Sequence, residues 1–238
     1  MICRVAGFVA LLATAFAADA GDSLPAEYAI RWDIADGGPQ SAAEAAAKLD
    51  PDGDKAEDSF EIRYFTVGAP PNLPPGFKAV IRERQKTNQK KYELTYKERG
   101  QTPLPDAPSL KDWACPVGAT KKKKDELDVS FHSLSDMARN RSRSCTVESE
   151  DAPPVVPKAL KATPAACTST MTRLKFKTIT IEEWHVSGGR TIVEVSQSGT
   201  STKDLEQFRN HIAKPLIEKH KIKPLKASMT ELGSACGK

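Results

Sequence analysis

The feature that most constrains the fold is a series of strand-like segments with charge on one face and apolar side chains on the other. Side chains alternate between two faces along a β-strand, so residues two apart share a face. Arg82 and Arg84 therefore lie together, as do Lys97 and Arg99 on the next segment. Segments with this alternation are 77–84, 92–99, 125–131 and 172–177. A sheet built from them has a charged face that is either solvated or lines a polar cavity.

The remaining periodicities predict a mainly antiparallel β (α+β) fold with two or three helices. Further strands are expected at 28–34, 60–67, 144–148 and 191–196, and the strand at 173 is expected to run on to 186. Helices are expected at 41–49, after a Ser-x-x-Glu capping box, and around an apolar stripe from 205 to 217 that contains Pro215. We expect 133–143 to be partly helical and 150–166 to be a proline-rich loop.

The N-terminus predicts a secretory signal peptide over residues 1–20, followed by one β-rich domain over 21–238. Arg4 precedes an apolar run from Val5 to Ala17, and small residues suited to a signal peptidase follow. The run is short for a membrane anchor, which is the alternative. No later segment reaches transmembrane length, so we expect no membrane span after cleavage and a secreted or periplasmic location.

Four cysteines would remain in the mature chain, and an even number in an exported protein suggests two disulfides. They are Cys115, Cys145, Cys167 and Cys236. Three pairings are possible. We favour Cys115–Cys145, which brackets the acidic strand, with Cys167–Cys236, which would tie down the tail. A zinc site is disfavoured because the cysteines are widely spread and form no Cys-x-x-Cys pair.

The charge balance does not indicate a specific nucleic-acid partner. The net charge is a modest +4, whereas nucleic-acid-binding domains usually carry a concentrated basic patch. One basic run is present, Lys121 to Lys124, and acidic residues follow it at once. We therefore interpret that run as a solvated loop leading into a strand.

The order of the charged strands resembles that of the CYTH family, the triphosphate tunnel fold. The resemblance covers roughly residues 27–232 and is carried by Arg82-Glu83-Arg84, Leu94-Thr95-Tyr96-Lys97, Glu126-Leu127-Asp128 and Val193-Glu194-Val195-Ser196. It implies an antiparallel tunnel barrel whose charged side chains point inward. In that family basic residues hold a triphosphate, and glutamates hold a divalent metal.

The resemblance implies two sets of candidate site residues. The anion-binding candidates are Arg31, Arg82, Arg84, Lys97, Arg173 and Lys175. The metal-ligand candidates, for Mg or Mn, are Glu27, Glu126, Asp128 and Glu194. The alternative is that these charges form cross-strand ion pairs on a solvated face.

The first strand departs from the family pattern. The family signature is Glu-x-Glu-x-Lys, whereas this chain has Glu27, Ala29 and Arg31 at the corresponding positions. The missing carboxylate weakens metal-assisted phosphoryl chemistry. The sequence thus favours an exported CYTH-like domain that binds an anionic, phosphate-containing small molecule or polyphosphate without established catalysis. A metal-dependent tri- or polyphosphate hydrolase and a non-catalytic structural or interaction module remain the alternatives.

Overall fold

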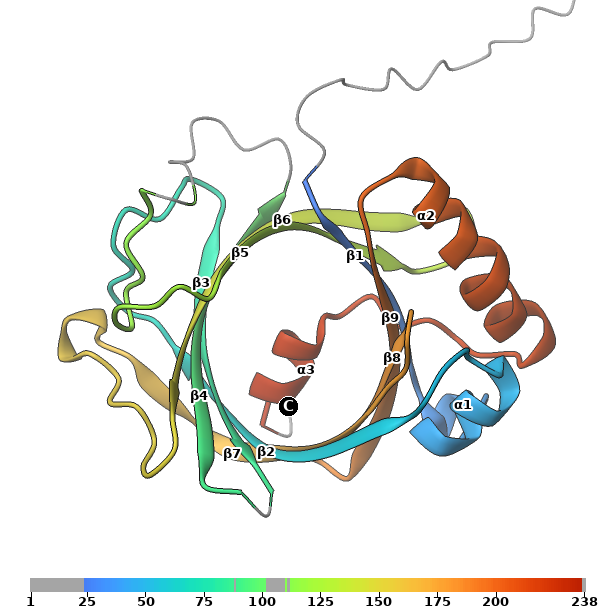
Figure 1. The fold of residues 1–238 in the computed structure, drawn as a ribbon, viewed down its shortest axis with the longest axis horizontal. Coiled ribbons are helices and arrows are strands. Elements are labelled where there is room, and N and C mark those ends of the chain that lie inside the picture. The colour runs from blue at the N-terminus through green and yellow to red at the C-terminus, as the bar shows by residue number, and fades with distance from the viewer. Residues whose placement is uncertain (1–23, 88, 102–109, 111, 237–238) are drawn as a thin grey trace, which may run out of the picture.

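Nine strands close into a barrel in the computed structural model, which describes residues 24–87, 89–101, 110 and 112–236 (Figure 1). Their order around the barrel is β1-β5-β6-β4-β3-β2-β7-β8-β9. Among these strands β1 pairs with β5 in parallel, and every other neighbouring pair is antiparallel. The strands are β1 (Ala26–Asp33), β2 (Ala56–Thr66), β3 (Lys78–Lys86), β4 (Lys91–Gln101), β5 (Lys123–Phe131), β6 (Met137–Ser149), β7 (Thr163–Lys175), β8 (Thr180–Val186) and β9 (Arg190–Gly199).

The predicted fold class is confirmed: the described chain is mostly antiparallel strand with a few helices. The helices are α1 (Ala42–Leu49), α2 (Thr202–Phe208) and α3 (Met229–Ser234). After α2 the chain continues helically with wider π-type turns, η3 (Arg209–Ala213) and η4 (Pro215–Lys219). Pro215 begins the second of these turns, where its missing N–H leaves no interior hydrogen bond broken.

The outer face of the barrel carries much of the apolar core, because the helices pack against it. Ile30 and Trp32 of β1 and Val195 of β9 are fully buried together with Phe208 of α2. In Figure 1, α1 and α2 both lie outside the barrel, beside the strands β1, β8 and β9. With apolar side chains directed outward on these strands, the alternating polar residues must face the lumen.

Three predictions for the connecting segments were wrong. Residues 137–143, which were expected to be partly helical, instead begin β6, and the strand expected at 144–148 is its second half. The arginines of β6 alternate and pair across the sheet, as Arg141 does with Asp125 at 2.8 Å. Within the expected 150–166 loop, β7 begins at Thr163; Pro164 is tolerated because β8 pairs with β7 only from Thr170 onward, so no partner needs its N–H on that side. The single strand expected from 173 to 186 is instead two antiparallel strands, β7 and β8, joined by a turn between Lys175 and Thr180.

Both favoured disulfides are present. Cys115–Cys145 joins the segment after β4 to β6, with Cα atoms 5.8 Å apart. Cys167–Cys236 joins β7 to the residue shortly after α3, with Cα atoms 5.3 Å apart. Bonds of this kind persist in oxidising compartments. The predicted signal peptide, residues 1–20, lies outside the described residues, and no described helix is long and apolar enough to cross a bilayer.

The tail holds an element that the sequence reasoning missed. Helix α3 begins after Ser228, whose hydroxyl accepts the N–H of Glu231 while the Glu231 carboxylate accepts the N–H of Ser228, forming a capping box. Figure 1 shows α3 within the outline of the barrel. Two contacts hold the tail to β1: Leu225 N–H donates to Arg31 O at 2.8 Å, and Arg31 Nη1 donates to Ala227 O at 3.3 Å. The tail therefore lies at one end of the lumen.

Candidate functional site

The inward faces of the strands line a cavity of about 460 Å³. Its described lining includes eight basic and six acidic side chains, together with serines and threonines. The charged face of the sheet therefore encloses a polar space, which is the second of the two arrangements that the alternation allowed. The volume lies within the range typical of small-molecule sites.

All six predicted anion-binding residues line this cavity: Arg31, Arg82, Arg84, Lys97, Arg173 and Lys175. They come from four strands, β1, β3, β4 and β7. Convergence of planar guanidinium groups on one space suits phosphate and carboxylate ligands. Whether they bind an anion stays a prediction.

Arg82 lies near the Tyr64 hydroxyl and the Glu182 carboxylate. Among the described residues it has no carboxylate within ion-pair distance, and its buried Nε has no hydrogen-bond partner. By contrast, Arg84 pairs with Glu93 on the neighbouring strand, and Arg173 donates to Asp58 at 2.6 Å. A buried donor without an acceptor costs stability, so an anion that accepts from Arg82 Nε would remove that penalty.

Three of the four predicted metal ligands lie together. Oxygen atoms of Glu27, Glu126 and Asp128 lie within 4.8 Å of one another. The parallel pairing of β1 with β5 causes this, since it sets Glu27 directly beside Asp128. The fourth, Glu194, stands apart from this cluster and pairs with Arg31 at 2.5 Å. We call Glu27, Glu126 and Asp128 the carboxylate cluster.

The carboxylate cluster is in an environment that disfavours negative charge. Burial raises the pKa of Glu27 to about 7; Lys97 opposes the rise, and the charges of Glu126, Asp128 and Glu194 add to it. Burial and the charge of Glu194, its neighbour across the β8–β9 pair, likewise raise the pKa of Glu182. Crowded, desolvated carboxylates of this kind are stabilised by a cation placed between them.

Asp128 is the best-anchored member of the cluster. Its Oδ2 is 3.0 Å from Lys97 Nζ and 3.2 Å from Arg99 Nε, and its Oδ1 accepts the hydroxyl of Ser142 at 3.2 Å. Glu126 is held more loosely, 3.6 Å from the exposed Lys124 ammonium. The cluster is thus joined to the basic wall through Asp128, and Glu27 is its least compensated member.

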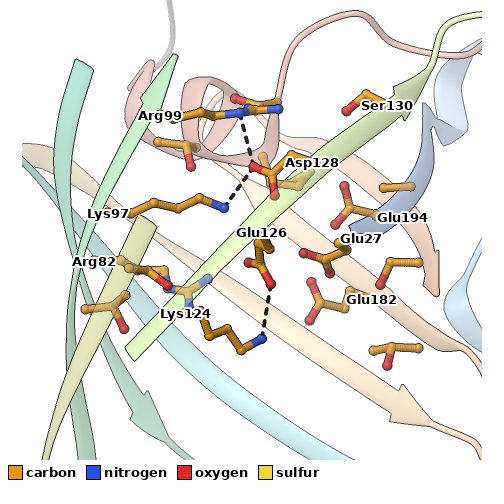
Figure 2. A pocket seen from close by; sticks show the side chains of 18 of the residues that line it. Glu27, Arg82, Lys97, Arg99, Lys124, Glu126, Asp128, Ser130, Glu182 and Glu194 are labelled. Atoms are coloured by element: carbon orange, nitrogen blue, oxygen red, sulfur yellow. Dashed lines mark ion pairs between the residues drawn. The ribbon is translucent and has the colours of Figure 1, made fainter. Parts of the chain in front are cut away.

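In the central part of the lumen, bases and crowded carboxylates lie on opposite sides (Figure 2). Figure 2 shows Arg82, Lys97 and Arg99 on one side, and Glu27, Glu182 and Glu194 on the other, with Glu126 and Asp128 between them. This arrangement leaves a space bordered by cations on one side and by clustered carboxylates on the other. An anion carrying a divalent cation would match both walls at once.

The residues fit a hard divalent metal such as Mg or Mn. The cluster offers oxygen ligands only, from two glutamates and an aspartate, which is the donor set that these ions prefer. Ala29 also lines the cavity, between Glu27 and Arg31, and contributes no carboxylate there. Three carboxylates would leave several positions on the metal to water or to a bound anion.

Sequence reasoning missed several members of the site. Arg99 and Lys124 line the cavity, although they were not among the candidates. Their signal was the strand alternation itself, because Arg99 and Lys124 share faces with Lys97 and Glu126. Ser228 and Thr230 reach the cavity from α3, and no alternation could have placed them there.

Comparison with known proteins gives distant likenesses. No family model matches the chain, and no curated protein matches it. Among solved structures, a conserved hypothetical protein from Pyrococcus furiosus shares 17% identity over 87% of this chain and 99% of its own, with a TM-score of 0.45. A Pyrococcus horikoshii protein shares 14% identity over 87% of this chain and 97% of its own, with a TM-score of 0.47.

A third similar structure comes from a plant. It is a Hippeastrum protein named for adenylyl cyclase and described as having a dominant triphosphatase activity. It shares 11% identity over 85% of this chain and 91% of its own, with a TM-score of 0.49. Similarity at this level does not assign a function, so the interpretation of the site depends on its own geometry.

Proposed function

We propose that this chain is an exported tunnel-type protein that binds a phosphate-containing polyanion inside its barrel, together with Mg or Mn. The observation that carries the proposal is that Arg82, whose buried Nε has no hydrogen-bond partner, lies in the same cavity as the carboxylate cluster. The resemblance of the strand motifs to the CYTH family supports the same function. The two disulfides support export, because such bonds are rare in reducing compartments.

Each wall has a distinct role in the proposed complex. Arg82, Arg84 and Lys97 would contact the phosphate oxygens, with the guanidinium groups donating paired hydrogen bonds. The carboxylate cluster would hold the divalent ion, which supplies positive charge to bridge cluster and anion. Asp128 would then need less of the charge of Lys97 and Arg99, which border the same space and would become available to the anion.

A second candidate function is hydrolysis of a tri- or polyphosphate. The carboxylate cluster favours it, since a metal beside a bound phosphate can stabilise charge in the transition state. Ala29 argues for weak catalysis, because the wall offers fewer carboxylates than the family signature implies. A purely structural role for the charged lumen is the remaining possibility, and it predicts no anion binding.

Calorimetric titration with tripolyphosphate tests the proposal. We expect saturable binding that is tighter with Mg or Mn, and a loss of at least about thirtyfold in Arg82→Ala, because a buried charge contact would be removed. Arg63→Ala is the matched control, since Arg63 is an exposed arginine on the strand adjoining β3. Absence of binding by the unmodified protein would favour the structural role.

The same samples separate binding from hydrolysis. Release of orthophosphate that requires Mg or Mn and disappears in Arg82→Ala would establish the hydrolase. Saturable binding without release would leave the binding function alone. Glu27→Gln should weaken the metal dependence of binding while leaving binding of the metal-free anion.

A further inference from the structure

A second, smaller cavity of about 110 Å³ lies at the end of the barrel away from α3. Arg84, Glu93 and Arg173 line both this cavity and the main one, so the two spaces adjoin. The smaller cavity adds Lys86 and Lys91, which face each other across the β3–β4 hairpin. We call the group Arg84, Lys86, Lys91 and Arg173 the mouth cations.

Two of the mouth cations are fixed in place by an aromatic ring. The guanidinium carbon of Arg84 lies 4.5 Å from the centroid of Phe60, and that of Arg173 lies 4.8 Å from it. Phe60 is itself buried, so its ring is a rigid support for both side chains. The Nε of Arg173 is buried and has no hydrogen-bond partner. These arginines are therefore held near each other with donor capacity to spare.

Electrostatics at the mouth supports an anion subsite. Burial and the nearby charges of Arg82 and Arg173 lower the pKa of Arg84, and Glu93 only partly offsets this. Asp58 compensates part of the charge, since it contacts both Lys86 at 2.5 Å and Arg173 at 2.6 Å. Glu93 pairs with Arg84, and Glu148 lies 3.9 Å from Lys91. The four mouth cations thus meet three carboxylates, which leaves a modest excess of positive charge.

The cations extend along the barrel farther than a triphosphate reaches. In the register of β3 and β4, Lys97 lies beside Val80, and Lys86 lies six residues farther along β3. At roughly 3.3 Å per residue this separation is about 20 Å. Arg82 and Arg84 occupy the intervening inward positions. The basic track therefore suits a linear anion with more than three phosphoryl groups.

The lining offers no surface suited to a nucleobase. Of the aromatic residues described along the main cavity, Tyr64 and Trp184 are 3% and 2% exposed. Phe60 at the mouth is 4% exposed and has two guanidinium groups over its ring. Stacking on an exposed aromatic face is a common way of holding a base. The described lining residues offer no such exposed aromatic face, which argues for a ligand without a nucleobase.

We propose that the mouth cations form a second anion subsite, and that the ligand is a linear inorganic polyphosphate longer than tripolyphosphate. The inference rests on the proposed function, and it adds the class of ligand and the roles of Lys86 and Lys91. In this arrangement, one end of the polyphosphate lies at Arg82 and the carboxylate cluster. The other passes Phe60 and leaves the barrel between Lys86 and Lys91.

A double variant, Lys86→Ala with Lys91→Ala, tests the subsite by calorimetry with two probes, long-chain inorganic polyphosphate and tripolyphosphate. We expect affinity for the long chain to fall about tenfold and affinity for tripolyphosphate to change less than about twofold. Lys90→Ala is the matched control, because Lys90 is an exposed lysine of the same hairpin that lines neither cavity. It should bind both probes as the unmodified protein does.

The outcomes distinguish this inference from the proposed function. Equal losses for both probes, or an equal loss in Lys90→Ala, would overturn the subsite and leave the proposed function standing. ATP binding more tightly than the long chain would overturn the ligand class. If neither polyphosphate binds to the unmodified protein, the proposed function and this inference fail together. Retained tripolyphosphate binding also shows that the double variant is folded.

Discussion

Buried charges occur in two regions of this molecule, and they are treated in opposite ways. On the outer side of the barrel, Arg143 donates to Glu98 at 2.7 Å, and the two side chains are 1% and 0% exposed. Tyr96 donates a further hydrogen bond to Glu98, and the Arg143 guanidinium lies 5.1 Å from the Trp113 ring. In the lumen, by contrast, Arg82 and Glu27 lie on opposite sides of the cavity, and neither has a matched ion pair of this kind.

The difference teaches what each group of charges is for. An ion pair that is dry, matched and covered by aromatic rings contributes to a defined packing arrangement and has no capacity left for a ligand. Charges of like sign that lie close together and are only partly compensated lower the stability of the fold unless a ligand of opposite charge binds them. The lumen therefore has the electrostatic character of a binding site, and the outer pair that of a structural contact.

Breaking the outer pair should produce the largest effect on stability. Glu98→Ala leaves the Arg143 charge buried without its carboxylate, and we expect the free energy of unfolding to fall by about 3–5 kcal/mol. Chemical denaturation measures it. Tripolyphosphate affinity of the folded variant should be unchanged. A loss below about 1 kcal/mol would show that the outer pair is not the structural contact described above.

Metal binding should stabilise the protein through the lumen alone. At about 100 times its dissociation constant, Mg or Mn should add about 2.7 kcal/mol to the free energy of unfolding. Glu126→Gln should abolish this gain, because it removes a cluster carboxylate. The control is Glu206→Gln, at an exposed glutamate of α2, which should retain it. Thermal denaturation with and without metal makes the comparison; an equal gain in both variants would place the metal elsewhere.

Removing a luminal charge should stabilise the metal-free protein, the reverse of the Glu98 result. Because the folded-state pKa of Glu27 is raised to about 7, its ionisation costs stability as pH rises from about 4.5 to 7. At pH 8 with chelator, we expect Glu27→Gln to be more stable than the unmodified protein by up to about 3 kcal/mol, which is the size of that shift at about 1.4 kcal/mol per pKa unit. Urea denaturation at pH 5 and pH 8 tests it. The same pH dependence in both proteins would contradict it.

The smallest effect is expected at the mouth. Hydrogen bonds from Lys86 and Arg173 lower the pKa of Asp58, so its contribution to stability is present above its unfolded pKa, near 3.8, and is lost as pH falls through the lower folded value. Asp58→Asn should cost about 0.5 kcal/mol at pH 7, because the pair is partly solvated. It should also tighten polyphosphate binding, measured by calorimetry. Weaker binding would mean that Asp58 positions the mouth cations.

The sequence was informative where alternation alone decides the outcome. Outward-facing Ile30 and inward-facing Arg31 follow from strand periodicity, and the same rule brought six bases into one cavity. It could not foresee that β1 pairs in parallel with β5, since that pairing joins segments about a hundred residues apart. The closeness of Glu27 to Asp128 depends on that pairing, so the cluster as such was not predictable.

The misassigned segments show a second limit of local patterns. Prolines between 153 and 164 suggested a loop, yet a strand tolerates Pro164 where its neighbour has not yet begun. Polar residues from 133 to 143 suggested a partial helix, because the partners of the arginines across the sheet, such as Asp125, do not appear in a local stretch of sequence. In both cases a tertiary contact decided the structure.

Closure of the barrel through β1 and β9 has a consequence for how the chain acquires its structure. Arg31 on the first strand meets Glu194 on the last, so the ring is completed only after nearly the whole polypeptide has emerged. Until then β1 presents an unpaired edge, which invites association with other chains. Contacts so distant along the chain slow folding. Newly made chains should therefore depend on chaperones that shield this edge, more than the stability of the finished barrel would suggest.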